Sequence, residues 1–259
     1  MKSDSLLTFI IFSNMRMNLM FQLENPMSLT EIKECFDVTS PNVVPRIKEL
    51  EKRNLIYKDY NKYKLTSMGN IMSKKLQTMV RLSSIIEEYG FFFNEHDIRP
   101  IPADLLIRID ELRNCKLNIN SKEDITAAYM EVLDNISKSS SVMGISSIFD
   151  SYYPEFFLSI AQRGDPISII LTDYVYRKVV ENYDESLQKY LKYDNARMYV
   201  IEDVKLAFVV TNTFLSISFY YKNGSYDIST NLINFEKPAI KWGEELFQYY
   251  KQKSKEIIK

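Results

Sequence analysis

The chain has 259 residues, of which 46% are hydrophobic and 26% are charged, a composition that suits packed domains and excludes a disordered chain. The net charge of −1 says nothing about partners. Its distribution is more informative, since residues 38–75 hold nine basic and three acidic side chains whereas residues 91–259 hold 20 basic and 24 acidic ones. A basic segment on an otherwise acidic chain indicates an anionic partner there, with a solvated charged face as the alternative.

Two cysteines, Cys35 and Cys115, are too few for a disulfide framework and fit a reducing cytoplasm. The apolar run of residues 6–12 follows Asp4 and precedes no small-residue cleavage site, so we interpret it as a buried helix rather than a signal peptide. No apolar run reaches the ~18 residues of a membrane span. We therefore expect a cytoplasmic protein with no membrane partner.

The N-terminal third has the pattern of successive short helices. Residues 13–23 place apolar side chains at helical spacing. Ser28 and Glu31 then match a capping box, in which a hydroxyl and a carboxylate each satisfy a free amide at a helix start. The helix that they open is predicted to stop at Asp37.

A second helix follows after a tight turn. Thr39 or Ser40 can cap it, and Pro41 is then expected at the first helical position, where a missing N–H costs nothing. Its predicted buried side consists of Val43, Ile47 and Leu50. Two helices joined in this way are typical of a helix-turn-helix.

Pro45 lies one turn into this helix, away from the apolar face. It removes an amide hydrogen bond to the carbonyl of Pro41, so the helix start is expected to bend or open. One interpretation is a helix start shaped for DNA, and the other is a harmless proline near a cap.

A basic hairpin is predicted next. Asn54 can adopt the left-handed conformation that ends the helix, and the following residues alternate as two strands around a turn at residues 60–62. Three lysines lie on this hairpin: Lys58, Lys62 and Lys64. A helix-turn-helix followed by a basic hairpin predicts a winged helix.

A helix of ~10 Å diameter fits a DNA major groove ~12 Å wide, while the hairpin follows the backbone. Asn42 can read adenine, Arg46 can read guanine, and apolar side chains can contact a thymine methyl. The predicted DNA-binding residues are Thr39, Ser40, Asn42, Val44, Pro45, Arg46, Lys48, Lys58, Lys62 and Lys64. The alternative is a winged helix that binds proteins without DNA.

Residues 67–93 carry an apolar stripe at helical spacing, which predicts a long helix. A second copy of the chain would bury that stripe, and a two-fold dimer matches palindromic sites with half-sites ~34–36 Å apart. The alternative is packing on the C-terminal domain. His96, the only histidine, sits between Glu95 and Asp97, whose side chains diverge, so a structural role is favoured over a metal ligand. Prolines at positions 100 and 102 predict a linker.

Residues 115–259 predict an α/β domain with a mixed sheet. Helices are expected at 123–137, 153–163, 173–192 and 238–250, and strands at 142–148, 167–172, 197–202, 206–211 and 214–221. Asn223-Gly224 predicts a type I′ turn. No nucleotide-binding glycine motif, GxSxG or Cys/His cluster occurs, so we predict no enzyme, cofactor or metal. The remaining interpretation of this part of the chain is a domain that senses a small molecule or a protein. The predicted domains are a winged helix-turn-helix DNA-binding domain at residues 1–66, a connecting and dimerisation helix with a linker at 67–114, and an effector domain at 115–259.

The run SLTEIKECFDVTSPNVVPRIKELEKRNLIYKDYNKYKLTSMG resembles archaeal winged-helix transcriptional regulators related to ArsR. Three later segments resemble the effector domain of a methanogen regulator family associated with methanogenesis and filament growth: ISSIFDSYYPEFFLSIAQRGDPISIILTDYVYRKV, KLAFVVTNTFLSISFYYKNGSYD and AIKWGEELFQYYK. The resemblance implies a sequence-specific DNA-binding regulator with double-stranded DNA as partner.

The effector domain is also similar to one half of a phospholipase-D-like fold. Enzymes of that superfamily carry His-x-Lys with an Asp five residues beyond the Lys. The nearest trace here is Asp203-Val204-Lys205, with Val210 at the Asp position. This resemblance therefore implies the fold and not the activity, and a phosphodiesterase is the least favoured alternative.

Overall fold

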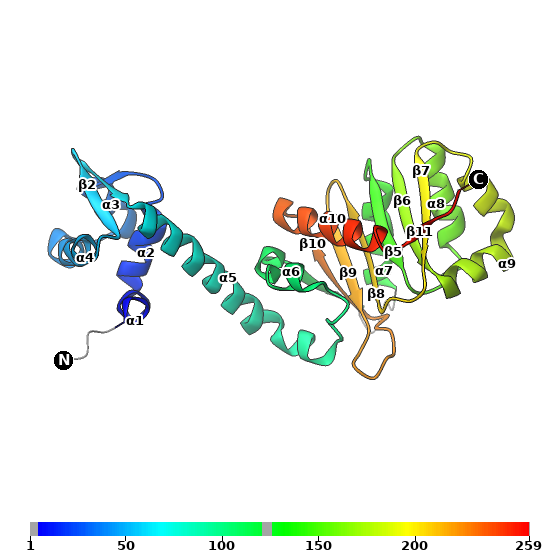
Figure 1. Ribbon diagram of the computed structural model, residues 1–259, viewed down its shortest axis with the longest axis horizontal. Coiled ribbons are helices and arrows are strands. Elements are labelled where there is room, and N and C mark those ends of the chain that lie inside the picture. Colours follow the sequence, from blue (N-terminus) through cyan, green and yellow to red (C-terminus); the bar gives the residue numbers. More distant parts are fainter. Residues whose placement is uncertain (1–4, 121–125, 259) are drawn as a thin grey trace. The chain divides into compact units, whose positions relative to one another are not determined.

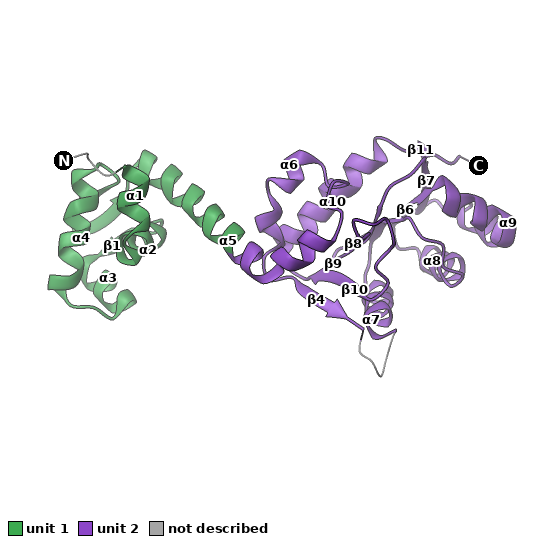
Figure 2. Ribbon diagram, turned by 90° about the horizontal axis from the view of Figure 1, so that it is seen from below, with its two compact units in different colours: residues 1–83 green, residues 84–259 purple. Residues whose placement is uncertain are grey.

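The computed structural model describes residues 5–120 and 126–258 and divides the chain into two compact units, residues 1–83 and 84–259 (Figure 2). The boundary falls within α5 (Ser67–Glu95), the long helix that the sequence predicts. No helix among the described residues is long and apolar enough to cross a membrane.

The first unit combines short helices, the start of α5 and a small antiparallel sheet (Figure 1). The helices are α1 (Leu6–Ile11), α2 (Asn14–Gln22), α3 (Leu29–Phe36) and α4 (Ser40–Lys52). The strands, in the spatial order β1-β3-β2, are β1 (Met27–Ser28), β2 (Ile56–Asp59) and β3 (Lys62–Leu65). The predicted helix pair and the hairpin after it are confirmed.

Local chemistry sets the ends of α3 and α4. The Ser28 amide donates to the Glu31 carboxylate at 2.6 Å, and the Glu31 amide donates to the Ser28 hydroxyl at 3.3 Å, which confirms the capping box. Asp37 ends α3 with φ +48°, and Asn54 follows α4 with φ +56°. Both residue types tolerate the left-handed region, so the chain turns there at little cost.

The start of α4 differs from the prediction. The helix begins at Ser40, so Pro41 is its second residue and not its first. Thr39 occupies the cap position, but its side chain makes no capping hydrogen bond. The amides of Asn42 and Val43 instead donate to the Thr39 carbonyl at 3.1 and 3.4 Å. Pro45 lies inside the helix, as predicted.

The core of the first unit draws on every helix of that unit. Its buried side chains are Ile10, Leu19, Met20, Leu23, Ile32, Val43, Ile47, Leu50, Leu55, Ile56 and Leu76. The predicted buried face of α4 is confirmed. The start of α5 packs closely, because a Cβ added at Gly69 would lie 1.9 Å from the Leu55 carbonyl oxygen. Residues 67–83, which we predicted as part of a connecting segment, therefore pack within this unit.

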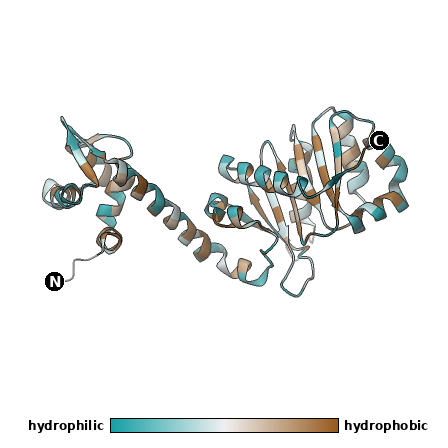
Figure 3. Cartoon of the chain, viewed as in Figure 1, coloured by the Kyte–Doolittle hydropathy of each residue, from teal (hydrophilic) through white to brown (hydrophobic). Residues whose placement is uncertain are grey.

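The second unit is built on an eight-stranded sheet in the order β11-β7-β6-β5-β8-β9-β10-β4 (Figure 1). Its strands are β4 (Lys116–Ile119), β5 (Val142–Ser146), β6 (Ile167–Thr172), β7 (Ala196–Ile201), β8 (Leu206–Thr211), β9 (Leu215–Phe219), β10 (Thr230–Asn234) and β11 (Lys255–Glu256). The pairs β5–β6 and β6–β7 are parallel, and the other neighbours are antiparallel. The predicted mixed sheet is confirmed. Figure 3 shows the apolar character of its central strands.

Helices cover both faces of this sheet. On one face α7 (Ala127–Ser137), α8 (Tyr153–Gln162) and α9 (Asp173–Tyr190) share an apolar core with β5, β6 and β7. The first expected residues of the predicted helix 123–137 lie outside the described residues. On the other face α10 (Lys237–Lys251) approaches so closely that a Cβ at Gly243 would lie 2.6 Å from Leu215 Cδ1 and 3.1 Å from Val210 Cγ2. Val209, one residue earlier, packs on the first face, as strand alternation requires.

The segment predicted as a linker is packed against α10. Trp242 is fully buried, and its indole N–H donates to the Leu105 carbonyl at 2.9 Å. The Tyr250 hydroxyl donates to the Pro100 carbonyl, and Arg108 pairs with Glu245 at 2.6 Å. These residues belong to or adjoin α6 (Ala103–Leu106) and η1 (Ile109–Leu112). The proline-rich stretch is therefore part of the second unit's fold.

The turn after β9 also differs from the prediction. Gly224 has φ +91°, but Asn223 is not among the described residues with positive φ, so the type I′ prediction is wrong. The Gly224 amide donates to the Tyr221 carbonyl at 2.8 Å, and the Asn223 side chain accepts from the Ser225 amide at 2.9 Å. The Asn side chain thus stabilises a turn whose glycine alone needs the left-handed region.

The apolar stripe of α5 does not lie in one environment. Leu76 is buried in the first unit's core. Tyr89 is buried in the second unit, where its hydroxyl donates to the Cys115 carbonyl. Between them, Met79 and Ile86 are each 59% exposed.

Candidate nucleic-acid interface

The exposed side of α4 carries most of the predicted contact residues. Asn42, Pro45 and Lys48 are exposed and recur every three residues on the side opposite the buried face, and Thr39, at the cap position before the helix, is also exposed. Ser40 and Arg46 are half-buried. This spacing gives one continuous helical surface that holds an amide, a proline ring and an ammonium group.

Val44 sits at the edge of that surface. Its side chain is half-buried and packs against the core of the first unit. Of the two apolar residues predicted to meet a thymine methyl, Pro45 is therefore the more accessible one.

Arg46 is held by an ion-pair network that the sequence analysis did not include. Its guanidinium lies 2.7 Å from Glu49 Oε1, and Arg16 of α2 lies 2.7 Å from Glu49 Oε2. Partial burial alone would raise the pKa of Glu49, but the hydrogen bonds from Arg16 and Arg46 more than offset it and keep that pKa below its ordinary value. Glu49 is thus a carboxylate that orients a guanidinium at the edge of the α4 surface.

Arg16 also belongs to an aromatic cluster. The Phe9 ring has the Arg16 guanidinium 4.1 Å from its centroid and the Arg53 guanidinium 4.0 Å from it. Cations over an aromatic face are attracted by its quadrupole. No local pattern predicts this arrangement, because Arg16 and Glu49 are 33 positions apart in the chain.

The hairpin lysines divide between its two faces. In the β2–β3 register, Asp59 pairs with Lys62 and Tyr57 with Lys64, whereas Lys58 pairs with Tyr63. Directly opposed residues share a face, so Lys62 and Lys64 lie on one face and Lys58 lies on the other. The three lysines predicted together do not form one surface.

These lysines also differ in their partners. Lys64 Nζ lies 2.5 Å from Asp59 Oδ2, and this hydrogen bond raises the pKa of Lys64. Lys62 is 3.9 Å from Glu31, at the limit of an ion pair. Within the described residues, Lys48 and Lys58 have no carboxylate within 4 Å, and Lys58 lies 5.6 Å from the Tyr63 ring centroid. Lys48, Lys58 and Lys62 are therefore the cations best placed for an external anion.

Two family models match this chain. Residues 4–84 match the N-terminal domain of the methanogenesis regulatory protein FilR1, and residues 125–253 match its middle domain. The chain belongs to the FilR1 family of methanogenesis regulatory proteins. The match to the N-terminal domain ends at residue 84, one residue after the end of the first compact unit.

One curated relative of this chain is the methanogenesis regulatory protein FilR1 of Methanothrix harundinacea (strain 6Ac). It is 27% identical over 255 residues, which cover 95% of this chain and 56% of the relative. The chain therefore spans little more than half the length of that relative. The relationship to ArsR stays a prediction.

Two solved structures are similar in outline. TrmBL2, described as an archaeal chromatin protein with a novel mode of DNA binding, is 13% identical, with a TM-score of 0.46 over 93% of this chain and 92% of that one. Nuc, a phospholipase D family member from Salmonella typhimurium, is 13% identical, with a TM-score of 0.40 over 56% of this chain and 100% of that one. With TM-scores below 0.5, neither likeness bears on the function.

Proposed function

We propose that this chain is a sequence-specific, DNA-binding transcriptional regulator whose first unit is a winged helix-turn-helix. The observation that carries the proposal is the exposed side of α4, where Asn42, Pro45 and Lys48 lie opposite the buried face. Membership of a family of regulatory proteins supports it. The cytoplasm is the compartment that such a regulator requires.

In this proposal α4 enters the major groove and the hairpin lies along the backbone. Asn42 and Arg46 read base edges, since amide and guanidinium groups suit adenine and guanine. Lys48 and Lys62 bind phosphates, which fix the register without reading sequence. Glu49 holds Arg46 in one orientation, so less conformational freedom is lost when the guanidinium meets a base.

We also propose that the regulator is a homodimer. The support is the middle of α5, where the exposed side chains of Met79 and Ile86 lie between Leu76, buried in the first unit, and Tyr89, buried in the second. A second copy of the chain is the partner that would cover these side chains. Two symmetry-related recognition helices would then read a palindromic site.

The second unit acts in this proposal as a sensor and not as an enzyme. His96 is the only histidine of the chain, and it is buried with its Nδ1 facing the Phe92 carbonyl and its Nε2 facing Asp227. A histidine engaged at both ring nitrogens is not free to act as a nucleophile or base. The other part of the proposal, regulation by an effector, requires that the effector bind two conformations with different affinity.

Selection of binding sites from random duplex DNA tests the proposal. The full chain should enrich a palindromic sequence, bind it in a salt-dependent way and elute at twice the monomer mass. Enrichment of no sequence, with no duplex binding at physiological salt, would overturn DNA recognition. A monomeric mass with a single half-site enriched would overturn the dimer alone.

A further inference from the structure

The second unit contains a cavity of about 360 Å³ that no part of the proposed DNA interface uses. It lies between helices α7 and α8 and the strands β5, β8, β9 and β10. A volume of this size suits a small organic ligand.

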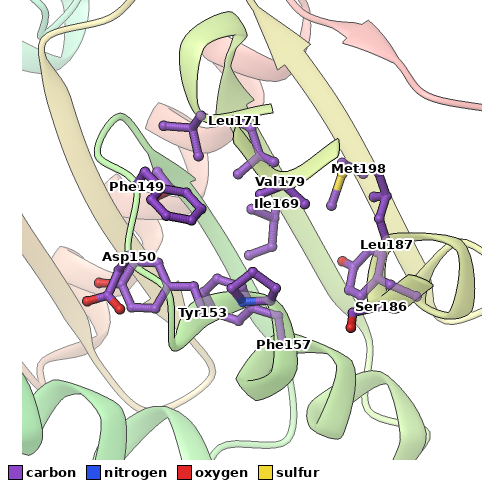
Figure 4. Close-up of a pocket in the computed structure, with 14 residues that line it drawn as sticks. Phe149, Asp150, Tyr153, Phe157, Ile169, Leu171, Val179, Ser186, Leu187 and Met198 are labelled. Carbon is purple, nitrogen blue, oxygen red and sulfur yellow. The ribbon is translucent and has the colours of Figure 1, made fainter. Parts of the chain in front are cut away.

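The wall on the helix side is aromatic and apolar. Tyr129 of α7 and Tyr153 of α8 stack with ring centroids 6.1 Å apart, and Phe157 of α8 continues this wall. Ile169 of β6 adds an apolar side chain from the sheet. Figure 4 shows Asp150, Tyr153 and Phe157 beside an adjoining cavity. That cavity has a volume of about 30 Å³ and shares five lining residues with the larger one: Ser146, Asp150, Tyr153, Phe157 and Ile169. The aromatic rings thus separate two neighbouring spaces.

The charged side chains among the described lining residues are all acidic. Two carboxylates line the cavity, Asp150 and Asp227, and none of its described lining residues is Lys, Arg or His. Asp227 is engaged by His96 at 3.1 Å and by the Ser229 hydroxyl at 2.7 Å. The described residues supply no cation for Asp150, whose carboxylate accepts the Tyr152 amide at 2.8 Å and lies next to the Tyr129 hydroxyl.

Tyr129 completes the polar part of this wall. Its buried hydroxyl makes no hydrogen bond to any described residue. Burial, followed by the nearby Asp150 carboxylate, raises the pKa of Tyr129 above its ordinary value. A carboxylate with no described cationic partner, next to a tyrosine hydroxyl and stacked rings, is an arrangement that can recognise an organic cation.

We propose that this cavity binds a small organic cation, with its ammonium group between Asp150 and the rings of Tyr129 and Tyr153 and its apolar body along Phe157 and Ile169. An anion is disfavoured, because the described lining residues include two carboxylates and no basic side chain. The inference rests on the proposed function, in which this cation is the effector of the sensor unit.

The cavity also has a route to α5. Asp227 lines the cavity and bonds His96, which directly follows the last residue of α5. A ligand that moves Asp227 therefore acts on the end of the helix whose start belongs to the DNA-binding unit. This gives a physical path by which a bound cation biases DNA affinity.

Three probes of matched shape and different charge test the binding site: phenethylamine, 2-phenylethanol and phenylacetate. Calorimetric titration of the full chain at neutral pH should rank the protonated amine above the alcohol and the alcohol above the carboxylate. Asp150→Asn should lower the affinity for phenethylamine about tenfold or more and leave that for phenylethanol unchanged. Asp134→Asn is the matched control, since Asp134 is an exposed carboxylate on α7 paired with Lys138.

Equal affinity for the three probes, no binding of any of them, or unchanged amine affinity in Asp150→Asn would each overturn the inference. Thermal unfolding of each variant verifies that the fold is retained. DNA binding is measured on the same samples. A chain that binds DNA but not the amine disproves the cation site alone, and one that binds the amine but not DNA disproves the proposed function alone.

Discussion

His96 Nε2 lies 3.1 Å from Asp227 Oδ2, while Nδ1 of the same ring lies 2.7 Å from the Phe92 carbonyl oxygen. Both side chains are almost completely buried, and the ring also stacks on Tyr221 with centroids 4.6 Å apart. Each of the two ring nitrogens therefore has a buried polar partner. The buried contact between His96 and Asp227 therefore fastens the end of α5 to the segment after β9.

Asp227→Asn should destabilise the second unit by roughly 2 kcal/mol or more, because Asn has one acceptor oxygen where the two carboxylate oxygens of Asp227 face His96 and Ser229. The measurement is the urea midpoint of that unit's unfolding transition. Asp173→Asn, which breaks the exposed pair with Arg177 on α9, is the control and should change the midpoint little. Equal midpoints for wild type and Asp227→Asn would disprove the structural role of the pair.

The same carboxylate gives the stability a pH dependence. Burial alone would raise the pKa of Asp227, but hydrogen bonds from Ser229, His96 and Tyr221 more than offset it and lower the pKa below its ordinary 3.8. Because the folded state holds the lowered pKa, the stabilisation is complete above the unfolded value and is lost as the pH falls through the folded one. The difference in urea midpoint between wild type and Asp227→Asn should therefore shrink below about pH 4. A constant difference between pH ~3 and ~6 would contradict this.

Elements set by local chemistry were predictable from the sequence. The capping box at Ser28 and Glu31, the left-handed residues Asp37 and Asn54, and the buried face of α4 depend on neighbours within a turn or two. The strands β4, β10 and β11 were missed, since they are short and carry Asn, Lys or Glu residues that are depleted in strands. They form only because neighbouring strands pair with them.

The contacts of the candidate sites that the sequence did not predict also join residues that are far apart in the chain. The bond between Arg16 and Glu49 spans 33 positions, and the bond between His96 and Asp227 spans 131. No periodicity links residues so far apart. The hairpin lysines were correctly placed on strands, but their division between two faces depends on the register, which the turn at Tyr60 sets with φ +51°.

Arg46→Ala should relax base preference at one position of each half-site. A bidentate contact from Arg to guanine is worth ~1–3 kcal/mol of discrimination, and Ala cannot make it. Competition between the selected site and single-base variants measures the effect. An unchanged preference at every position would show that Arg46 reads no base, and Lys189→Ala on α9 serves as a variant outside the interface.

Lys62→Ala should weaken binding to all sequences and lower the slope of log affinity against log salt by about one, as expected for one lost phosphate contact. Lys64→Ala should do less, since Lys64 is already paired with Asp59 at 2.5 Å. Fluorescence anisotropy at a series of salt concentrations gives both slopes. A larger change for Lys64 than for Lys62 would contradict the placement of the accessible cations.

Glu49→Gln separates orientation from charge at the α4 surface. The substitution removes the carboxylate that lies 2.7 Å from both Arg46 and Arg16. It also makes the surface proposed to face the DNA major groove more positive by one unit of charge. We expect tighter binding to non-specific DNA with a steeper salt dependence, because the guanidinium groups are freed for phosphates. Discrimination at the position read by Arg46 should fall, because the guanidinium is no longer held in one orientation.

The ratio of specific to non-specific affinity measures this effect. Glu34→Gln is a useful control, since it removes an exposed carboxylate from α3 and adds the same charge. If both substitutions change the ratio equally, the effect is one of net charge and Glu49 does not orient Arg46. A fall in the ratio for Glu49→Gln alone is the result expected if the ion-pair network presets the contact that reads the base.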